Sequence, residues 1–274
     1  MIGSSFAFSL MHLCVKAMPH IPVFELVFFR SLGSLLITLF YLNKNKTPIF
    51  GNNKKVLFAR GFFGTAGLCL FFLTLQNIPL AGAVTIQYLS PIFTALFAVF
   101  ILRERVEKRQ WLFFAFAFAG VCLLKGFDAS GQISSLFVFI GVVSACFSGL
   151  AYNCIRYLRS SESALVVVFY FPLVATPITG ALSILNWVKP QGVDWVYIVS
   201  LGIVTQAAQV FMTKGIQSDV AGNIMTYKYV GVVFAFVYGF YIFKETYSFL
   251  SLFGIFLLLS GVILNAVFKI RKKP

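Results

Sequence analysis

Residues 81–107 read AGAVTIQYLSPIFTALFAVFILRERVE, and the first 22 of them carry no charged side chain. A helix needs about 20 apolar residues to cross the roughly 30 Å of bilayer hydrocarbon. The apolar run stops at Arg103, Glu104 and Arg105, as expected where a helix leaves the membrane. The stretch therefore predicts a transmembrane helix over residues 81–102.

The composition of the whole chain also indicates a membrane protein. Of its 274 residues, 59% are hydrophobic, 11% are charged and eight are acidic, whereas a soluble domain carries about 25% charged residues. These values exclude an ordinary soluble enzyme, a disordered chain and a secreted disulfide scaffold. The net charge of +14 does not indicate nucleic acid as a partner, because the basic residues lie in short clusters between apolar runs.

Apolar runs of membrane length recur along the entire chain. A helix satisfies its own backbone in lipid, and the runs are continuous and about twice as long as a barrel strand. We therefore predict an all-α integral membrane protein with ten transmembrane helices. The first is expected to be a retained helix, because it lacks a basic leader and an Ala-x-Ala cleavage site. The approximate limits are 2–21, 23–42, 56–77, 81–102, 110–125, 133–155, 164–187, 195–214, 221–242 and 248–268.

The basic residues predict the orientation of the chain in the membrane. With the N-terminus inside, fifteen Lys and Arg residues fall in the inner loops and the C-terminal tail, and four fall on the outer side. Basic residues accumulate on the cytoplasmic side of membrane proteins. We therefore expect both termini to be cytoplasmic and the chain to lie in the plasma (inner) membrane.

Two segments of the chain resemble each other. Residues 102–107 (LRERVE) match residues 243–248 (FKETYS) at an offset of 141, and each is followed by an apolar helix ending in Gly-Val-x-Leu. The chain is therefore predicted to hold two five-helix repeats, 1–125 and 131–274. Because five is odd, the second repeat would enter the membrane from the opposite side. Such inverted repeats exchange conformations to give inward-open and outward-open states.

Taken together, these motifs resemble the EamA family of ten-helix carriers in the drug/metabolite transporter superfamily. The resemblance covers essentially the whole chain, and its clearest segments are Gln87–Thr94 (QYLSPIFT), Glu104 and Trp111 through Val121. The second half departs from the first at Val232, which stands where the repeat would place a second proline. The first hairpin, with Lys16, Glu25 and Arg30, is similar to the branch that includes S-adenosylmethionine carriers. The resemblance implies a central cavity lined by helix nine.

Ionisable groups inside the hydrocarbon are costly and mark candidate sites. Lys228 lies about seven residues into the helix 221–242, which contains no Asp or Glu. It either snorkels to the inner surface or faces the cavity and meets an anionic substrate group. Gln87 and Tyr88 are the repeat counterparts of the region around Tyr227. Pro91 removes the helical donor of a nearby carbonyl, which is either a structural kink or a free acceptor for a ligand.

Uncharged polar residues also share helix faces. Gln206, Gln209 and Thr213 follow helical spacing in the eighth helix and must be buried, against another helix or along a pathway. Two further sets of polar residues lie on or beside shared faces of the first and sixth helices, and four of them, His12, Lys16, Tyr152 and Asn153, are candidate substrate contacts. The two sets are His12 and Lys16 with Ser5 and Ser9, and Tyr152 with Asn153, Ser144 and Ser148.

Three more charged residues are candidates for coupling or structure. Glu25 lies near Lys16 and Arg30 in sequence, so it either forms an ion pair that fixes the first hairpin or couples transport to protons, as His12 also could. Arg60 lies shortly after Lys54 and Lys55, and we expect it to reach the inner surface.

These features favour a secondary transporter that moves a small metabolite by alternating access. The buried charge is net positive, so an amino acid, S-adenosylmethionine or a similar zwitterionic or anionic compound is the expected substrate, with a proton or counter-substrate as a possible coupling partner. A membrane channel or a non-transporting scaffold is the alternative. An enzyme is not expected, because paired membrane acids and an aligned nucleophile and base are missing from the sequence. No cofactor and no metal site are predicted.

Overall fold

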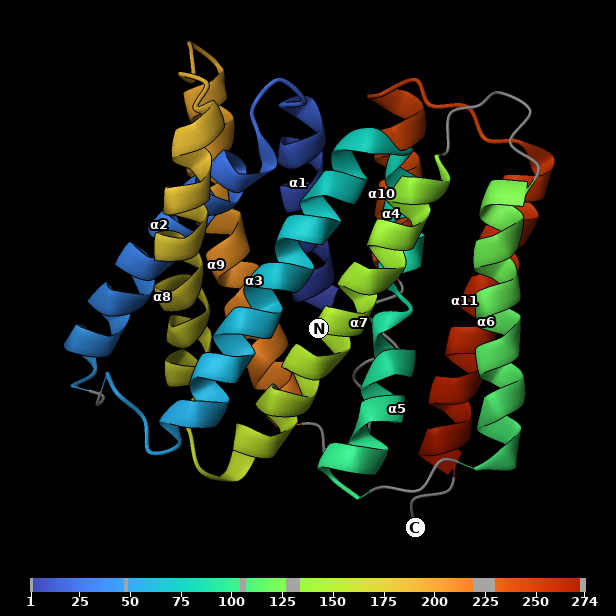
Figure 1. The fold of residues 1–274 in the computed structure, drawn as a ribbon, viewed down its shortest axis with the longest axis horizontal. Coiled ribbons are helices and arrows are strands. Elements are labelled where there is room, and N and C mark those ends of the chain that lie inside the picture. Colours follow the sequence, from blue (N-terminus) through green and yellow to red (C-terminus); the bar gives the residue numbers. More distant parts are fainter. Residues whose placement is uncertain (1, 47–48, 104–106, 127–133, 219–229, 272–274) are drawn as a thin grey trace.

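The computed structural model describes residues 2–46, 49–103, 107–126, 134–218 and 230–271, and within these ranges the chain is helical without β-strands (Figure 1). Short 3₁₀ turns extend the ends of α7 and α8. The helices are α1 (Ile2–Ala17), α2 (Val23–Lys44), α3 (Lys54–Asn77), α4 (Leu80–Gln87), α5 (Ser90–Ile101), α6 (Lys108–Gly126), α7 (Ser135–Tyr157), α8 (Ala164–Ser183), α9 (Asp194–Ser218), α10 (Val230–Tyr241) and α11 (Phe249–Arg271).

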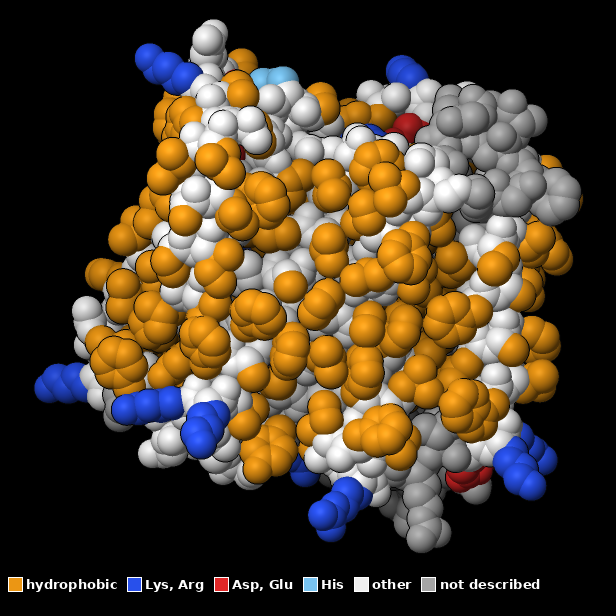
Figure 2. Space-filling view, viewed as in Figure 1, with side chains coloured by type: hydrophobic (Ala, Val, Ile, Leu, Met, Phe, Trp, Pro, Cys, Tyr) orange, Lys and Arg blue, Asp and Glu red, His pale blue; other side chains and the backbone are white. Residues whose placement is uncertain are grey.

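The outer surface of the bundle is apolar. On the face drawn in Figure 2, hydrophobic side chains cover a broad area across the middle, and Lys and Arg gather mainly along the lower edge. Phe100, Phe139 and Phe256 are among the large apolar side chains that are more than half exposed, which suits contact with lipid rather than water. Within the described residues, six segments are long and apolar enough to cross a membrane, and α1, α10 and α11 add shorter apolar helices. The chain is a multi-pass membrane protein.

Prolines determine where the first helix ends and where the second helix begins. The first was expected to continue to residue 21, but α1 ends at Ala17, because Pro19 and Pro22 cannot donate a backbone hydrogen bond within a helix. Pro22 lies immediately before Val23, the first residue of α2. The predicted limits 23–42 and 56–77 agree with α2 and α3 to within two residues.

The predicted helix 81–102 is broken into α4 and α5. Tyr88 and Leu89 form the break. Their backbone N–H groups donate to Thr85 O and Ile86 O, three residues back, with N···O distances of 3.0 Å. Pro91 stands where the helical donor to the carbonyl of Gln87 would lie. The break therefore leaves polar backbone and the Gln87 and Tyr88 side chains at mid-helix. In the second half, Val232 takes the place of that proline near the start of α10, and the segment before Val230 lies outside the described residues.

Helices far apart in sequence pack together. The most extensive contacts join α6 to α11, α3 to α7, α2 to α8, and α1 to α9. Figure 1 shows α6 and α11 side by side at one edge of the bundle and α2 with α8 at the other. Further contacts join α3 to α8, α2 to α9, α5 to α7, α4 to α10, and α1 to α10.

The contact between α6 and α11 depends on two glycines. A Cβ atom on Gly120 would lie 2.5 Å from the Leu258 nitrogen and 2.6 Å from the Gly254 oxygen, and one on Gly261 would lie 2.5 Å from the Phe113 oxygen. No larger residue fits there without moving the partner backbone, so the helices touch along their main chains. Residue numbers rise along α6 as they fall along α11, which makes the two helices antiparallel.

Candidate functional site

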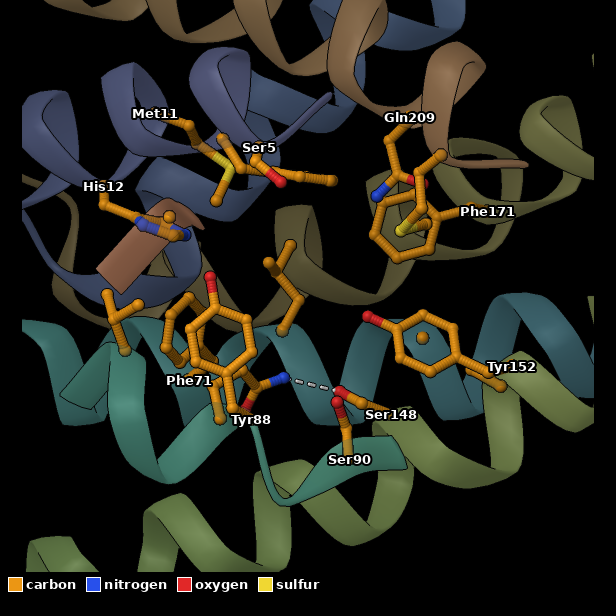
Figure 3. Close-up of a pocket in the computed structure, with 18 of the residues that line it drawn as sticks. Ser5, Met11, His12, Phe71, Tyr88, Ser90, Ser148, Tyr152, Phe171 and Gln209 are labelled. Carbon is orange, nitrogen blue, oxygen red and sulfur yellow. Dashed lines mark hydrogen bonds between the residues drawn. The ribbon is translucent and has the colours of Figure 1, made fainter. Parts of the chain in front are cut away.

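Residues of both halves of the chain enclose a cavity of about 110 Å³ in the interior of the bundle. Its described lining comes from α1, α2, α3, α4, α5, α7, α8, α9 and α10. In Figure 3, Ser5, Met11 and His12 reach in from α1 on one side, and the Tyr88 and Tyr152 rings project from the α4–α5 break and from α7 on the opposite side. Polar groups and aromatic rings thus face one another across a shared space.

Two arginines lie in the cavity wall. Arg30 is fully buried, and its Nε donates a hydrogen bond to Thr205 Oγ1 at 3.3 Å. Arg60 is 2% exposed, and its Nη2 lies 3.4 Å from Gln209 Oε1. The guanidinium carbons lie 5.0 and 5.2 Å from the ring centroid of Phe171, within the range of cation–π contact.

The expectation that Arg60 reaches the inner surface is wrong. Gly61 and Gly64 let α8 come so close to α3 that added Cβ atoms would contact Val174 and Phe171 respectively, at 2.7 Å. Arg60 is therefore enclosed between α3, α8 and α9, and its side chain extends into the cavity rather than along the helix to water.

Both Arg30 and Arg60 retain unused hydrogen-bond donors. Nη1 and Nη2 of Arg30 and Nε of Arg60 are buried and have no hydrogen-bond partner among the described residues. The described cavity lining contains no Asp or Glu. The cavity wall therefore carries two positive charges that its described residues do not neutralise.

Five of the uncharged residues predicted from the sequence also line this cavity, namely His12, Gln87, Tyr88, Tyr152 and Gln209. The Nδ1 atom of His12 has no hydrogen-bond partner within the described chain, and its ring meets Phe71 edge-on at 5.2 Å. The Gln87 amide donates to Ser148 Oγ at 2.8 Å and accepts from Ser144 Oγ at 3.0 Å. The break in α4–α5 is thus fixed against α7.

Other predicted residues hold helices together. Gln206 accepts a hydrogen bond from Ser34 and joins α9 to α2. Asn153 donates to Thr94 O at 3.0 Å and joins α7 to α5. Both lie away from the described cavity lining, although Gln206, Gln209 and Thr213 are all buried as their shared face predicts.

Lys16 lies at one end of the bundle. Its Nζ donates to Ile78 O at 2.6 Å and lies 3.4 Å from Glu245 Oε1. Glu245 also accepts the backbone N–H of Leu80, the first residue of α4, at 2.9 Å. Glu245 therefore satisfies a backbone donor at the start of α4 from a distant part of the chain.

The ion pair considered for Glu25 does not form. Glu25 is fully buried and accepts the backbone N–H of Val188 at 3.0 Å. Its two expected partners are engaged elsewhere: Lys16 pairs with Glu245, and Arg30, further along α2, lines the cavity and donates to Thr205. Proton coupling through Glu25 or His12 stays a prediction.

Lys228, Tyr227 and Glu104 lie outside the described residues. No sequence pattern distinguishes Phe171, which is 3% exposed and whose ring contacts both cavity arginines. It is one of 34 phenylalanines, so its role depends on the packing of α8 against α3. The Gly61 and Gly64 spacing beside Arg60 is the one local pattern that indicates a close helix contact there.

Comparison with known proteins gives the family. The EamA-like transporter family matches residues 1–125 and 135–267. The pseudopaline exporter CntI of Pseudomonas aeruginosa is 31% identical over 255 residues, which cover 92% of this chain and 89% of that protein. Solute carrier family 35 member G1 of Homo sapiens is 30% identical, covering 86% of this chain and 69% of that protein.

Two further likenesses are more distant. The S-adenosylmethionine uptake transporter of Rickettsia prowazekii is 23% identical, covering 81% of this chain and 75% of that protein. One crystal structure, 18% identical, shares the fold with a TM-score of 0.69 over 99% of this chain and 98% of its own. The named relatives are transporters rather than enzymes, in agreement with the prediction from sequence. The chain belongs to the EamA-like transporter family.

Proposed function

We propose that this transporter is a secondary carrier that moves a small zwitterionic or anionic metabolite by alternating access. Ten transmembrane helices would form two inverted five-helix repeats, 1–125 and 131–274, on either side of the cavity. Arg30, Arg60, His12, Gln87, Tyr88, Tyr152 and Gln209 would contact the substrate, with Lys228 and Tyr227 as further candidates.

The reciprocal contact of α6 and α11 carries this proposal. Gly120 meets Leu258, and Gly261 meets Ala117; adding the 141-residue offset to Gly120 and Ala117 gives Gly261 and Leu258. The contact is therefore unchanged when the two halves are exchanged. Because the two helices are antiparallel, a two-fold axis that exchanges them is perpendicular to the helix axes. Such an axis lies in the plane of the membrane, which supports an inverted rather than a parallel repeat.

Helix positions support the same offset. The first residues of α6 and α11, Lys108 and Phe249, are 141 residues apart. Arg103 and Lys244, also 141 apart, both adopt a left-handed backbone conformation, with φ of 55° and 53°. This conformation is uncommon for residues other than glycine. Its recurrence at the repeat offset supports two copies of one structural unit.

The helix contacts also support an exchange of halves. In the proposed repeat, the equivalent helices are α1 and α7, α2 and α8, α3 and α9, and α4–α5 and α10. Under this equivalence the α3–α7 contact corresponds to the α9–α1 contact, and the α3–α8 contact corresponds to the α9–α2 contact. Both members of each pair are present. The cavity lies where the exchanged units meet, which is where inverted-repeat transporters bind their substrates.

Charge supports the orientation and the class of substrate. The exposed residues Lys44, Lys54 and Lys108 lie at the ends of α2, α3 and α6, and Figure 2 shows Lys and Arg gathered mainly along one edge of the molecule. We assign that edge to the cytoplasmic side of the plasma (inner) membrane, with both termini on the same side. The two cavity arginines favour an anionic metabolite over S-adenosylmethionine, the substrate named for one relative, because its sulfonium would add positive charge.

Transport through the cavity is testable with one pair of variants. Leu68 lines the cavity, and Leu136 is 60% exposed on the outer face of α7. In liposomes, the purified protein is expected to move at least one member of a panel of radiolabelled amino acids and small carboxylates. Leu68→Trp is expected to reduce that flux at least tenfold, because it fills the cavity, and Leu136→Trp is expected to leave it within twofold. Equal flux through both variants would contradict transport through this cavity, and no flux of any compound would favour the scaffold alternative. Flux that does not saturate would favour a channel.

A further inference from the structure

The cavity arginines differ from the other buried charged groups of the described chain. Lys16 and Glu245 form an ion pair, and Glu25 and Glu162 each accept a backbone hydrogen bond, with Oε1 of Glu25 left unpaired among the described residues. Arg30 and Arg60 instead face each other's charge around Phe171, with donors left unused. Burying two like charges without an anion is strongly unfavourable. The arrangement is therefore incomplete without a negatively charged occupant.

The geometry limits what that occupant is. Both guanidinium carbons lie within about 5 Å of one ring centroid, at 5.0 and 5.2 Å, so they are at most about 10 Å apart. A guanidinium binds a carboxylate through two parallel N–H bonds. Phe171 contacts both groups, while Nη1 and Nη2 of Arg30 and Nε of Arg60 are left without a partner among the described residues. One small molecule can place a carboxylate against each arginine within this distance.

The charge of the occupant follows from the lining. The described lining holds two arginines and no acid. A zwitterion, whose net charge is zero, would leave both positive charges uncompensated, and a monocarboxylate would leave one.

We propose that Arg30, Phe171 and Arg60 form a binding site for a small organic anion that carries at least two carboxylates. This inference rests on the proposed function, since it assigns the substrate class of the same cavity. Gln209, beside Arg60, fixes one guanidinium, and Thr205 fixes the other. His12 and the Tyr152 ring lie across the same space and supply polar contacts to the body of the anion.

Ligand binding to the purified protein in detergent tests the site without requiring transport. Calorimetric titrations would use succinate, propane-1,2,3-tricarboxylate, butyrate, serine and dimethyl succinate. Succinate and the tricarboxylate are expected to bind at least tenfold more tightly than butyrate, serine or the ester. Arg60→Gln is expected to weaken succinate at least tenfold but butyrate less than threefold, because one arginine remains. Arg60→Lys, which keeps the charge, is expected to recover part of the loss, and the exposed Arg109→Gln serves as the control.

The outcomes separate the site from the transport mechanism. Serine binding as tightly as succinate, or Arg60→Gln weakening butyrate and succinate equally, would overturn the two-carboxylate site even if the carrier still moves another metabolite. Tight, arginine-dependent binding of succinate without flux in liposomes would support the site and contradict the carrier. A folded Arg60→Gln protein, verified by its elution profile and melting temperature, is required for the comparison, and Arg30→Gln repeats the test at the second arginine.

Discussion

Replacing Glu245 with glutamine is expected to reduce the initial rate of transport at least tenfold. Glu245 joins three parts of one end of the bundle, since it pairs with Lys16, accepts the Leu80 N–H and accepts the Tyr247 hydroxyl at 2.7 Å. Burial raises the pKa of Tyr247, and the hydrogen bond to Glu245 raises it further, so the phenol stays a donor. Glutamine would leave the partly buried Lys16 without an opposite charge. If the substitution destabilised the conformation in which Glu245 makes these contacts by about 2 kcal/mol, the equilibrium between this conformation and the others of the transport cycle would shift about 30-fold.

The charge-swapped double variant tests whether the pair itself matters. Lys16→Glu combined with Glu245→Lys restores opposite charges, so it is expected to recover part of the rate lost in Lys16→Glu alone. The measurement is initial uptake in liposomes, with protein folding checked by size-exclusion chromatography. Wild-type transport by a folded Glu245→Gln protein would show that this end of the bundle does not control the transport cycle.

Exchange of substrate on one side of the membrane for substrate on the other is expected to be at least tenfold faster than net transport in one direction. In the empty carrier the cavity holds two arginines without an acid among its described lining, and the effective cost of enclosing such a charge away from water is several kcal/mol. Each 1.4 kcal/mol added to the barrier slows the step tenfold. The loaded carrier, neutralised by its anion, avoids this cost. The empty carrier is therefore predicted to reorient slowly.

Labelled succinate is the probe for this prediction. Liposomes preloaded with unlabelled succinate are expected to take up the label at least tenfold faster than liposomes loaded with carboxylate-free buffer. The Leu68→Trp variant provides the background rate. Equal uptake into both kinds of liposome would contradict the argument from uncompensated charge, because the empty carrier would then return as fast as the loaded one.

The apolar runs and the prolines made much of the fold predictable. A run of about 20 apolar residues has one stable form in lipid, so the limits of α2 and α3 agree with expectation. Pro91 predicted a disturbance near Gln87, and the structure places the break between α4 and α5 at Tyr88 and Leu89. These are local effects, which sequence spacing records directly.

The partners of buried charges were not predictable in the same way. Proximity in the sequence suggested that Lys16 or Arg30 would pair with Glu25. It also suggested that Arg60, close to Lys54 and Lys55, would reach the aqueous surface. Tertiary packing decides otherwise, because α2 meets α8 and α9 while α3 is held close to α8 by Gly61. Polar residues within apolar helices were predictable as candidate site residues, and five of them line the cavity, namely His12, Gln87, Tyr88, Tyr152 and Gln209. Phe171 was not predictable, because its sequence context does not distinguish it from other core phenylalanines.

The compartment of two equivalent positions tests the inverted arrangement most directly. Lys108 and Phe249 begin α6 and α11, lie 141 residues apart and are exposed, Phe249 by 84%. Single cysteines at these positions, in a background lacking the five native cysteines, would be treated in intact cells with a membrane-impermeant maleimide. The inverted repeat predicts labelling of Phe249→Cys in intact cells and of Lys108→Cys only after permeabilisation. Labelling of both from the same side would contradict it.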